Sequence, residues 1–367
     1  MKRVKIELFF IAATAVLTMF IYSCTDSSSP IFYTLENEKQ VVDTSLDNSL
    51  SVHSFVTDGT NYYAAAGSIF YRSVQAGSQT WNKVTSSGVS DASGTTMLCN
   101  KLVEFNGKYY AAFISQDGNT HGLYSTDSLG SSITWTKATY EEISDKQITN
   151  IIVVNGNLLA VRLESTNPGT YYLYYSSDGA SFTEATALSE GPVPIIDAAY
   201  DNASSEYWVM TENKLFKGSD LSGLTETASP TAPPEGFGGI IYSADFSKLF
   251  VSTQNGIIYG SDDNGAAWSQ VGDTAKVSDK SVPFGGFAKI DNSTIFVATK
   301  GYGFYIITGG TVISRFTNST ISGLYNAVIN SFYVDSSANL GTVFICTSGS
   351  GLWSNATPND DTAWKWE

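Results

Sequence analysis

Paired carboxylates are the residues of this chain whose types and spacing first suggest chemistry. Glu141-Glu142 and Asp262-Asp263 each put two acids side by side, and a suitably placed pair could supply the acid and base of a glycoside hydrolase or lyase. However, the 367 residues include Asp+Glu 35 against Lys+Arg 20, so adjacent acids are expected on solvated loops. The sequence therefore leaves such catalysis open without assigning it to either pair.

Thiol, imidazole and hydroxyl groups offer little further chemistry. His53 and His121 have no cluster of His or Cys near them, so we predict no metal site and no cofactor. Cys99 and Cys346 lie among apolar residues, which favours burial over reactivity. Residues 349–351, Gly-Ser-Gly, are only superficially similar to a nucleophile elbow, because neither a strand-to-helix pattern nor a nearby histidine accompanies them.

The elements that position these residues repeat along the chain. An apolar run that ends in Asp or Asn and a turn, followed by a second apolar run, recurs every 44 to 49 residues. The marker residues of the repeats are Asp58, Asn106, Asn155, Asp201, Asp245, Asp291 and Asp335. A β-sandwich has no reason to repeat with this period, whereas the four-stranded blades of a propeller do.

Each repeat contains four short β-runs, which are clearest in the fifth copy, at residues 239–243, 248–252, 256–260 and 268–271. The pairs Asp58-Gly59, Asn106-Gly107 and Asn155-Gly156 separate the first two runs of three copies and favour tight hairpins with positive φ. We therefore predict an all-β fold, a β-propeller of seven four-stranded blades, over residues 51–367.

The turn after the third run resembles a family motif. Residues 261–268 read Ser-Asp-Asp-Asn-Gly-Ala-Ala-Trp, which is similar to the Asp box (BNR repeat) of sialidase-like propellers, and partial copies begin at Ser73, Ser125 and Ser176. The resemblance implies that the motif lies on the face away from the active site of that family. Its side chains can bond the backbone of the hairpin. Structural roles are expected for Ser261, Asp263, Gly265 and Trp268.

Sialidase activity itself is not predicted. That reaction needs three arginines that converge on the substrate carboxylate, and after residue 23 the chain has only Arg72, Arg162 and Arg315. None of them lies in the Phe/Tyr-Arg-Ile-Pro segment that the family has in its first blade, and Arg72 falls in a third run. The missing arginine segment disfavours a sialidase, while another glycoside hydrolase or lyase stays open.

The first 23 residues are typical of a targeting signal. A positively charged start precedes the apolar stretch 9–21, and residues 21–24, Ile-Tyr-Ser-Cys, resemble a bacterial lipobox. The resemblance implies a signal peptide over residues 1–23 and lipidation of Cys24; a plain signal peptide or an uncleaved anchor is the alternative. We expect residues 24–50 to form a tether with an N-terminal strand segment, in an outer-membrane lipoprotein that is periplasmic or surface-exposed.

The loops between second and third runs, together with the links between repeats, should gather on the face opposite the Asp boxes. Their amides, carboxylates and tyrosines are typical of sugar and polar-peptide recognition. Tyr302 is the first candidate, because its flanking glycines should expose its ring. The candidate ligand-binding residues are Tyr302, Lys300, Tyr140, Glu142, His121, Glu164 and Tyr325.

The net charge limits the partners. A formal charge of -15 disfavours nucleic acid, and it gives no help in binding anionic lipid, so contact with the membrane is expected through the lipid anchor only. We predict a non-catalytic module of the cell envelope that binds a glycan or a protein. A carbohydrate-active enzyme and an envelope assembly factor are the alternatives.

Overall fold

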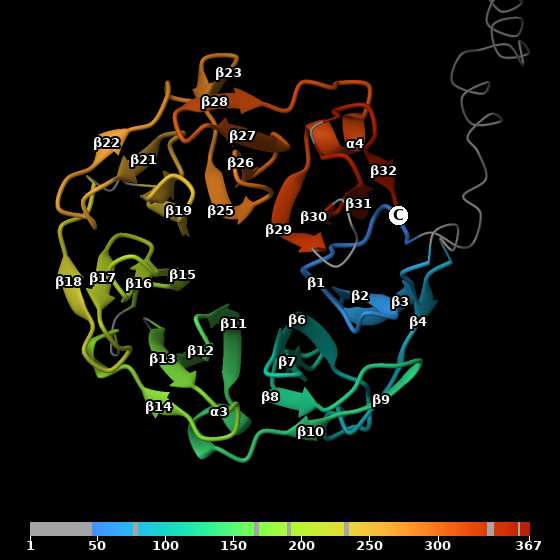
Figure 1. Ribbon diagram of the computed structural model, residues 1–367. Helices are drawn as coiled ribbons and strands as arrows, with labels where there is room; N and C mark the ends of the chain where they lie inside the picture. Colours follow the sequence, from blue (N-terminus) through green and yellow to red (C-terminus); the bar gives the residue numbers. More distant parts are fainter. Residues whose placement is uncertain are drawn as a thin grey trace, which may run out of the picture. The chain divides into compact units, whose positions relative to one another are not determined.

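The computed structural model describes residues 46–75, 80–164, 169–188, 192–230, 235–335, 341–358 and 360–367. Within the unit Ser45–Glu367, seven four-stranded antiparallel sheets are arranged as blades around a common axis (Figure 1). The predicted all-β, seven-bladed β-propeller is confirmed. The predicted signal peptide, Cys24 and the tether as far as residue 45 lie outside the described residues.

The four strands of each blade follow one another in chain order from the axis outwards. The strands of blades 1 to 4 are β1 (Ser54–Thr57), β2 (Asn61–Ala66), β3 (Ser68–Ser73) and β4 (Asn82–Lys83); β6 (Leu98–Phe105), β7 (Lys108–Ile114), β8 (His121–Thr126) and β10 (Thr136–Lys137); β11 (Gln147–Val154), β12 (Asn157–Glu164), β13 (Thr170–Ser176) and β14 (Thr183–Glu184); β15 (Ile195–Asp201), β16 (Glu206–Thr211), β17 (Leu215–Gly218) and β18 (Thr225–Thr227). Those of blades 5 to 7 are β19 (Phe237–Ser243), β20 (Lys248–Thr253), β21 (Ile258–Ser261) and β22 (Ser269–Gln270); β25 (Phe284–Lys289), β26 (Thr294–Thr299), β27 (Phe304–Thr308) and β28 (Val312–Arg315); β29 (Val328–Asp335), β30 (Thr342–Ser348), β31 (Leu352–Asn355) and β32 (Lys365–Trp366).

Short elements lie outside the seven blade sheets, in the connections between blades and in the segment between β8 and β10. Two of them are small sheets, in which β5 (Thr85–Ser87) pairs in parallel with β9 (Ser132–Thr134), and β23 (Lys276–Val277) forms a hairpin with β24 (Lys280–Ser281). The others are the one-turn helices α3 (Glu141–Ser144) and α4 (Ser322–Tyr325) and the 3-10 helix η1 (Thr186–Leu188). The repeat pattern predicted none of these elements.

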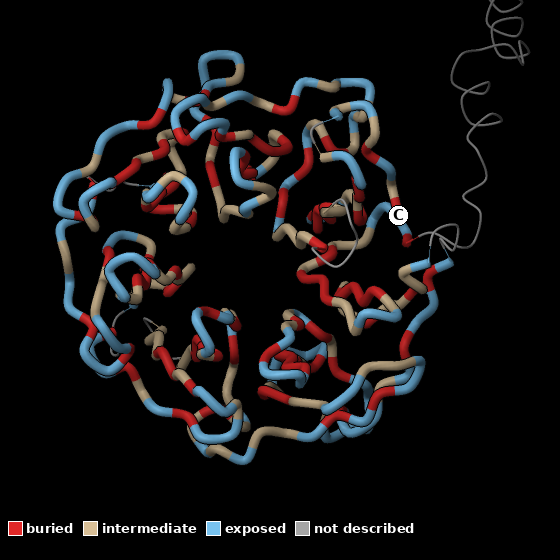
Figure 2. Tube along the Cα trace, in the orientation of Figure 1, coloured by how far each residue is buried: buried red, intermediate tan, exposed pale blue. Residues whose placement is uncertain are grey.

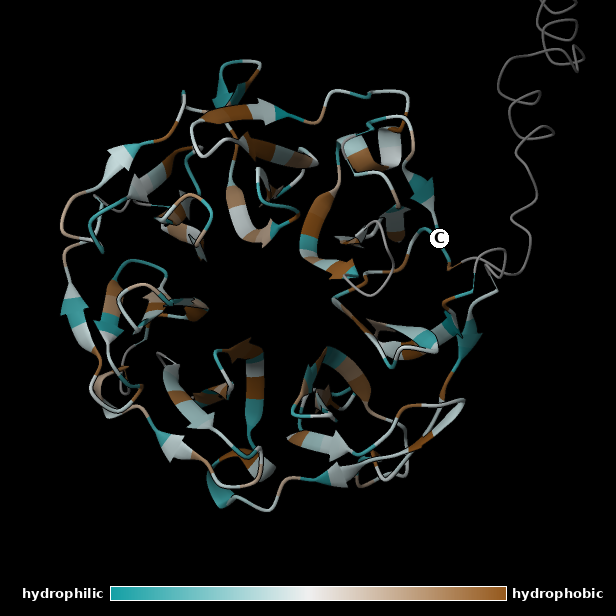
Figure 3. Cartoon of the chain, viewed as in Figure 1, coloured by the Kyte–Doolittle hydropathy of each residue, from teal (hydrophilic) through white to brown (hydrophobic). Residues whose placement is uncertain are grey.

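The second strand of a blade is apolar on both faces because a neighbouring blade covers each face. All six residues of β26 are buried, as are the apolar residues 158–161 of β12. The two-residue outer strands β4 and β22 are exposed throughout. Figure 2 shows this gradient as burial along the inner strands and exposure at the rim, and in Figure 3 the outer strands β18 and β32 are hydrophilic.

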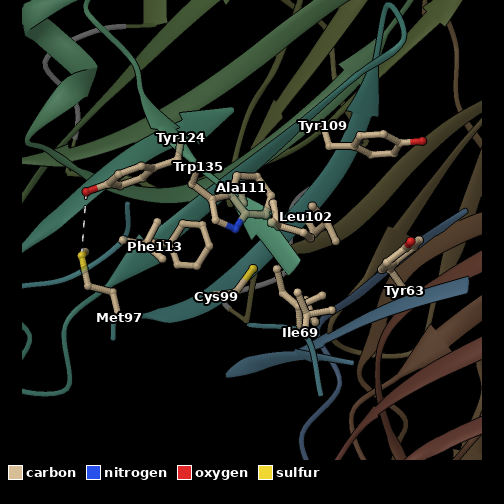
Figure 4. Close-up of a cluster of buried hydrophobic side chains, with 14 of the residues drawn as sticks. Tyr63, Ile69, Met97, Cys99, Leu102, Tyr109, Ala111, Phe113, Tyr124 and Trp135 are labelled. Carbon is tan, nitrogen blue, oxygen red and sulfur yellow. Dashed lines mark hydrogen bonds between the residues drawn. The ribbon is translucent and has the colours of Figure 1, made fainter. Parts of the chain in front are cut away.

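Seven buried hydrophobic clusters form the core, one at each interface between neighbouring blades. In the cluster between blades 1 and 2 (Figure 4), Trp135 packs edge-on against Phe113 with ring centroids 5.2 Å apart. Cys99 belongs to this cluster and Cys346 to the one between blades 7 and 1, and burial raises the pKa of each thiol to about 12. All seven clusters lie within Ser45–Glu367, so the described part of this unit has a hydrophobic core of its own, which a domain requires.

All three predicted hairpins between first and second strands contain positive φ angles, at both residues of the pair in two of them. The Asn-Gly pairs at 106–107 and 155–156 have φ angles of 52° and 74°, and of 43° and 70°, as a type I′ turn requires. At Asp58-Gly59 the prediction is confirmed for Gly59, whose φ is 83°, whereas Asp58 does not have positive φ. The Asp58 N–H donates to the Asn61 carbonyl at 3.1 Å, and Asp58 Oδ1 accepts the N–H groups of Thr60 and Asn61 at 2.7 and 2.6 Å.

Non-covalent contacts close the ring between blades 7 and 1, since each of these blades takes its four strands from one stretch of chain. The Leu46 N–H donates to Glu367 O at 3.0 Å, and the Val52 N–H donates to Thr347 O at 2.9 Å. Residues 46–50, the described part of the expected N-terminal strand segment, contain a turn and no strand. Their contribution to closure comes from these contacts with the last blade.

Candidate functional site

The predicted ligand-binding residues share one face of the ring. Because successive strands alternate in direction, the connections from second to third strands and the links between blades lie at the same end of the blades. These connections hold His121 at the start of β8, Glu164 at the end of β12, Lys300 and Tyr302 between β26 and β27, Tyr140 and Glu142 at the start of α3, and Tyr325 at the end of α4. We name this end the loop face and the opposite end the Asp-box face.

Arg162 gathers several of these residues at blade 3. Its guanidinium, which is almost fully buried, forms ion pairs with Glu142 and, at 3.3 Å, with Glu164. It also donates to the Tyr174 hydroxyl at 3.2 Å and lies 4.7 Å from the centroid of the Tyr172 ring. The two carboxylates are about half exposed, so Arg162 fixes their position while leaving one side of each open to solvent.

Arg315 binds two further candidates, Tyr302 and Tyr325, at blade 6. Its Nη1 donates to the Tyr325 hydroxyl and its Nη2 to the Tyr325 carbonyl, both at 2.9 Å, and its Nε donates to the Tyr302 carbonyl at 3.1 Å. The guanidinium also lies 3.9 Å from the centroid of the Tyr325 ring. Tyr302 is half-buried against the core cluster of blades 5 and 6, so its ring is less open than its flanking glycines suggested.

Of the remaining candidates, Tyr140 adjoins the Arg162 group, while Lys300 and His121 have no contact with either arginine among the described residues. Lys300 Nζ donates to Gln254 Oε1 at 2.7 Å, which links the second-to-third connections of blades 5 and 6. Tyr140 packs against the Tyr174 ring with centroids 6.0 Å apart. Burial lowers the pKa of His121, whose Nδ1 has no hydrogen-bond partner among the described residues. The structure thus forms two separate arginine-centred groups instead of one site.

The three arginines serve three different blades. Arg72 on β3 forms an ion pair with Glu367 at 2.8 Å, with 9% and 3% of the two side chains exposed. Arg162 on β12 and Arg315 on β28 bind groups of their own blades and of the adjoining helical links. This placement differs from the convergent set that sialidase chemistry needs.

The Asp-box turn of blade 5 is held by its own side chains. Ser261 Oγ donates to Asp263 Oδ1 and accepts from the Gly265 N–H, both at 2.8 Å. Asp263 Oδ1 accepts a further backbone N–H at 2.9 Å. Trp268 packs edge-on against Trp208, with ring centroids 6.2 Å apart. These contacts are the ones that a structural role requires.

The partial copy in blade 3 makes the same turn. Ser176 Oγ donates to Asp178 Oδ1 and accepts from the Gly179 N–H, again at 2.8 Å. Hydrogen bonds from two backbone N–H groups and from Ser176 hold the pKa of Asp178 at about 2. Phe182, which is buried, takes the place of the tryptophan. The hydrogen bonds of the turn therefore persist where the sequence motif is degraded.

A belt of polar residues around the axis was missed by sequence reasoning. Six innermost strands, β6, β11, β15, β19, β25 and β29, carry a register irregularity at the same level. The residue that follows it is Lys101 in β6, Asn150 in β11, Asp197 in β15 and Ser331 in β29. The available signal is a polar residue inside an apolar run, four or five positions before the marker residue.

Most of this axial belt binds across the seams between blades. Asn150 Nδ2 donates to the Ile196 carbonyl of blade 4 at 3.1 Å. Asp197 Oδ2 accepts the Ile240 N–H of blade 5 at 3.0 Å, and Asp197 Oδ1 accepts the N–H of the next residue at 2.9 Å. Burial raises the pKa of Asp197 to about 6, against the effect of these two N–H groups and of the charge of Lys101.

A pocket of about 430 Å³ lies next to the belt, toward the Asp-box face. Residues of blades 1, 2, 3 and 7 line it, among them Val56, Val103, Val153 and Tyr333. We name it the axial pocket. Its wall is mostly apolar, and Val153 is 43% exposed within it.

Among the residues that the structure describes, no group of three or more His, Cys, Asp or Glu side chains could hold a metal ion. In the same part of the chain, no helix has the length and apolar character that crossing a membrane requires.

Comparison with known proteins gives the fold. No family model and no curated protein matches the sequence. The structure of YCF48 bound to D1 peptide is similar to this chain with a TM-score of 0.57 and 14% sequence identity, and the match covers 83% of this chain and 91% of that chain. For YCF48 from Cyanidioschyzon merolae the TM-score is 0.57 and the identity is 11%, and the match covers 86% of this chain and 98% of that chain. For the extracellular domain of the one-component system BT4673 from B. thetaiotaomicron, the TM-score is 0.59 and the sequence identity is 12%. The match covers 85% of this chain and 39% of that chain. At these identities the similarity shows a shared β-propeller fold.

Proposed function

We propose that this chain is a non-catalytic binding module of the cell envelope whose loop face binds a protein partner. The observation that carries the proposal is the fixing of loop-face connections by arginine: Arg162 holds α3 through Glu142, and Arg315 holds α4 through Tyr325. Connections fixed in advance lose less conformational entropy on binding, so they favour recognition. Half-exposed carboxylates and tyrosines on such a scaffold suit polar peptide segments.

A protein fits this face better than a glycan does. Sugar sites commonly stack rings on open aromatic surfaces, but Trp81, Trp135, Trp208 and Trp364 are buried and the other three tryptophans are half-buried. Tyr302 is also partly covered. The YCF48 structure with D1 peptide provides an example of a similar fold that binds a protein segment.

Photo-crosslinking in cells tests the partner class and the face. A photoreactive phenylalanine analogue would replace Glu142 or Lys300 on the loop face, and Lys108 or Asp262 on the Asp-box face as matched controls. We expect discrete protein adducts from the loop-face positions and none from the controls. Adducts from the controls alone, or none from either face, would contradict the proposal. If crosslinking gives no protein adducts and Ser45–Glu367 binds selectively to a glycan array, the ligand of the loop face is a glycan.

We further propose that lipid at Cys24 holds the domain at the outer membrane, periplasmic or surface-exposed. The support is the sequence pattern of residues 1–24. Metabolic labelling with an alkyne fatty acid should mark the full chain and leave a Cys24→Ser variant unmarked. Label that persists in Cys24→Ser, or that is missing from both proteins, would rule out lipidation at this residue.

A further inference from the structure

Lys101 is the exception in the axial belt. Its neighbours in the belt use their polar groups across the blade seams: Ser331 Oγ donates to the His53 carbonyl at 2.9 Å, and Asn150 and Asp197 bind as described above. Lys101 is half-buried, yet among the described residues its ammonium has neither a hydrogen-bond nor an ion-pair partner. A charge left in this state costs free energy, so its presence needs an explanation.

The Lys101 charge acts on several blades. Burial lowers the pKa of His53 in blade 1, and the charge of Lys101 lowers it further. Burial raises the pKa of Asp197 in blade 4 and of Cys346 in blade 7, and the charge of Lys101 opposes both shifts. Lys101 follows the same register irregularity of its innermost strand as Asn150, Asp197 and Ser331 do, which puts it in the ring of residues nearest the axis.

Asp197 does not neutralise Lys101 directly. Both oxygens of Asp197 accept backbone N–H groups at the seam of blades 4 and 5, at 2.9 and 3.0 Å. No contact ion pair between Asp197 and Lys101 occurs in the described structure. The ammonium therefore keeps its capacity to bind another anion.

The axial pocket supplies the apolar half of a binding site. Lys101 directly precedes residues 102–104 of β6, which line the pocket together with Val56, Val153 and Tyr333. Val153 is one of three large hydrophobic residues with substantial exposure in the described chain. The volume of about 430 Å³ is in the range of small-molecule sites.

We propose that the ring axis binds a monocarboxylate with an apolar body, with the body in the axial pocket and the carboxylate on the ammonium of Lys101. A single negative charge matches the single cation. Glu104 at the pocket wall, Asp197 in the belt and the formal charge of -15 disfavour ligands with several negative charges. This site lies toward the Asp-box face, so it is independent of the proposed function of the loop face.

Calorimetric titration of the Ser45–Glu367 domain tests the site. The probes are 4-phenylbutyrate and decanoate, each beside its neutral amide, and the tripeptide Gly-Gly-Phe with a free or an amidated carboxyl end. We expect the acids to bind about tenfold or more tightly than the amides, which is the scale of one charge-assisted hydrogen bond. Tighter binding of 4-phenylbutyrate or decanoate would identify the ligand as a free acid. Tighter binding of Gly-Gly-Phe would identify it as the carboxyl end of a peptide chain.

Variants locate the binding. Lys101→Met should reduce acid affinity to that of the amides, whereas Lys108→Met on the Asp-box face should leave it unchanged. Val153→Glu should also abolish acid binding because it puts a like charge in the pocket wall; the matched control is Val312→Glu, at a position that is 60% exposed in blade 6. Acid binding that survives Lys101→Met, equal binding of acids and amides, or no binding of any probe would overturn the proposal. Thermal unfolding of each variant verifies that it is folded.

Discussion

At Gly265, backbone conformation and packing both require glycine. Its φ is +78°, and an added Cβ would lie 2.2 Å from the Trp208 ring. Gly59 has a similar φ of +83° with nothing near its Cβ position, so it isolates the backbone effect. We expect Gly265→Ala to lower the free energy of unfolding by about 2–5 kcal/mol and Gly59→Ala by about 1–2 kcal/mol, measured by urea denaturation. Equal losses of unfolding free energy in the two variants would show that the clash of the added Cβ with the Trp208 ring costs nothing.

Asp197 should make stability depend on pH in a direction opposite to that of most acids. Burial raises its pKa to about 6, above the value of about 3.9 for an unfolded Asp. The folded state therefore binds more protons between these values, and the contribution of Asp197 to stability falls as the pH rises from about 4 to about 6. Lys101 is the cation that opposes this shift.

The Asp197→Asn variant isolates this contribution. Urea denaturation at pH 4, 5, 6 and 7 should show the parent chain losing stability relative to Asp197→Asn as the pH rises. Parallel curves would mean that the Asp197 carboxyl titrates alike in the folded and unfolded states.

At the scale of elements, each arginine should hold one helical link. The N–H groups of Ile143 and Ser144 in α3 bond the Tyr140 carbonyl at 3.1 and 2.9 Å, and in α4 the N–H of Tyr325 bonds the Ile321 carbonyl at 2.9 Å. We expect Arg162→Met to speed hydrogen exchange of the α3 amides about tenfold or more, since its carboxylate and hydroxyl contacts are lost.

Arg315→Met is the reciprocal control and should speed exchange at α4 while leaving α3 unchanged. Mass spectrometry of peptic fragments separates the two links. Equal exchange at α3 in Arg162→Met and the parent would show that apolar packing of Ile143 holds the link without the arginine.

The blades could be predicted because their turn residues repeat, whereas the elements without such signals could not. The hairpin of β23 and β24 turns at Ser278-Asp279, where two residues other than glycine have φ angles of 51° and 65°. The fourth run predicted at residues 268–271 contains β22, which is only two residues long. Local chemistry thus reveals a turn only where a glycine or Asn-Gly pair marks it.

The candidate site was predicted in part, for the same reason. Strand alternation alone puts Tyr302, Glu142 and the other candidates on one face. Their division between Arg162 and Arg315 depends on distances between elements, which a single sequence does not contain. Lys101 escaped notice because the register irregularity before it interrupts the two-residue alternation of β6.

For the whole molecule, ring closure rests on contacts between the first and last blades. The core cluster at this seam contains Phe55 and Phe344, whose rings stack with centroids 4.3 Å apart. The ion pair of Arg72 with Glu367 lies beside it, and the Arg72 guanidinium is 5.0 Å from the Tyr62 ring centroid. Since no strand is exchanged in the described part of this seam, these side chains join the two ends of the domain.

Breaking the Arg72–Glu367 pair should therefore weaken the domain as a unit. Its charges are almost fully buried, so Glu367→Gln removes the carboxylate charge next to Arg72 and should cost about 3–5 kcal/mol. A double-mutant cycle with Arg72→Met, measured by urea denaturation of Ser45–Glu367, should give a coupling energy of about 1–3 kcal/mol. Lys289→Met, which breaks the more exposed pair of Lys289 with Asp245 between blades 5 and 6, should cost below about 1 kcal/mol. Additive effects at Arg72 and Glu367 would mean that the other contacts of the seam close the ring without the ion pair, because an ion pair that joins the ends must couple them.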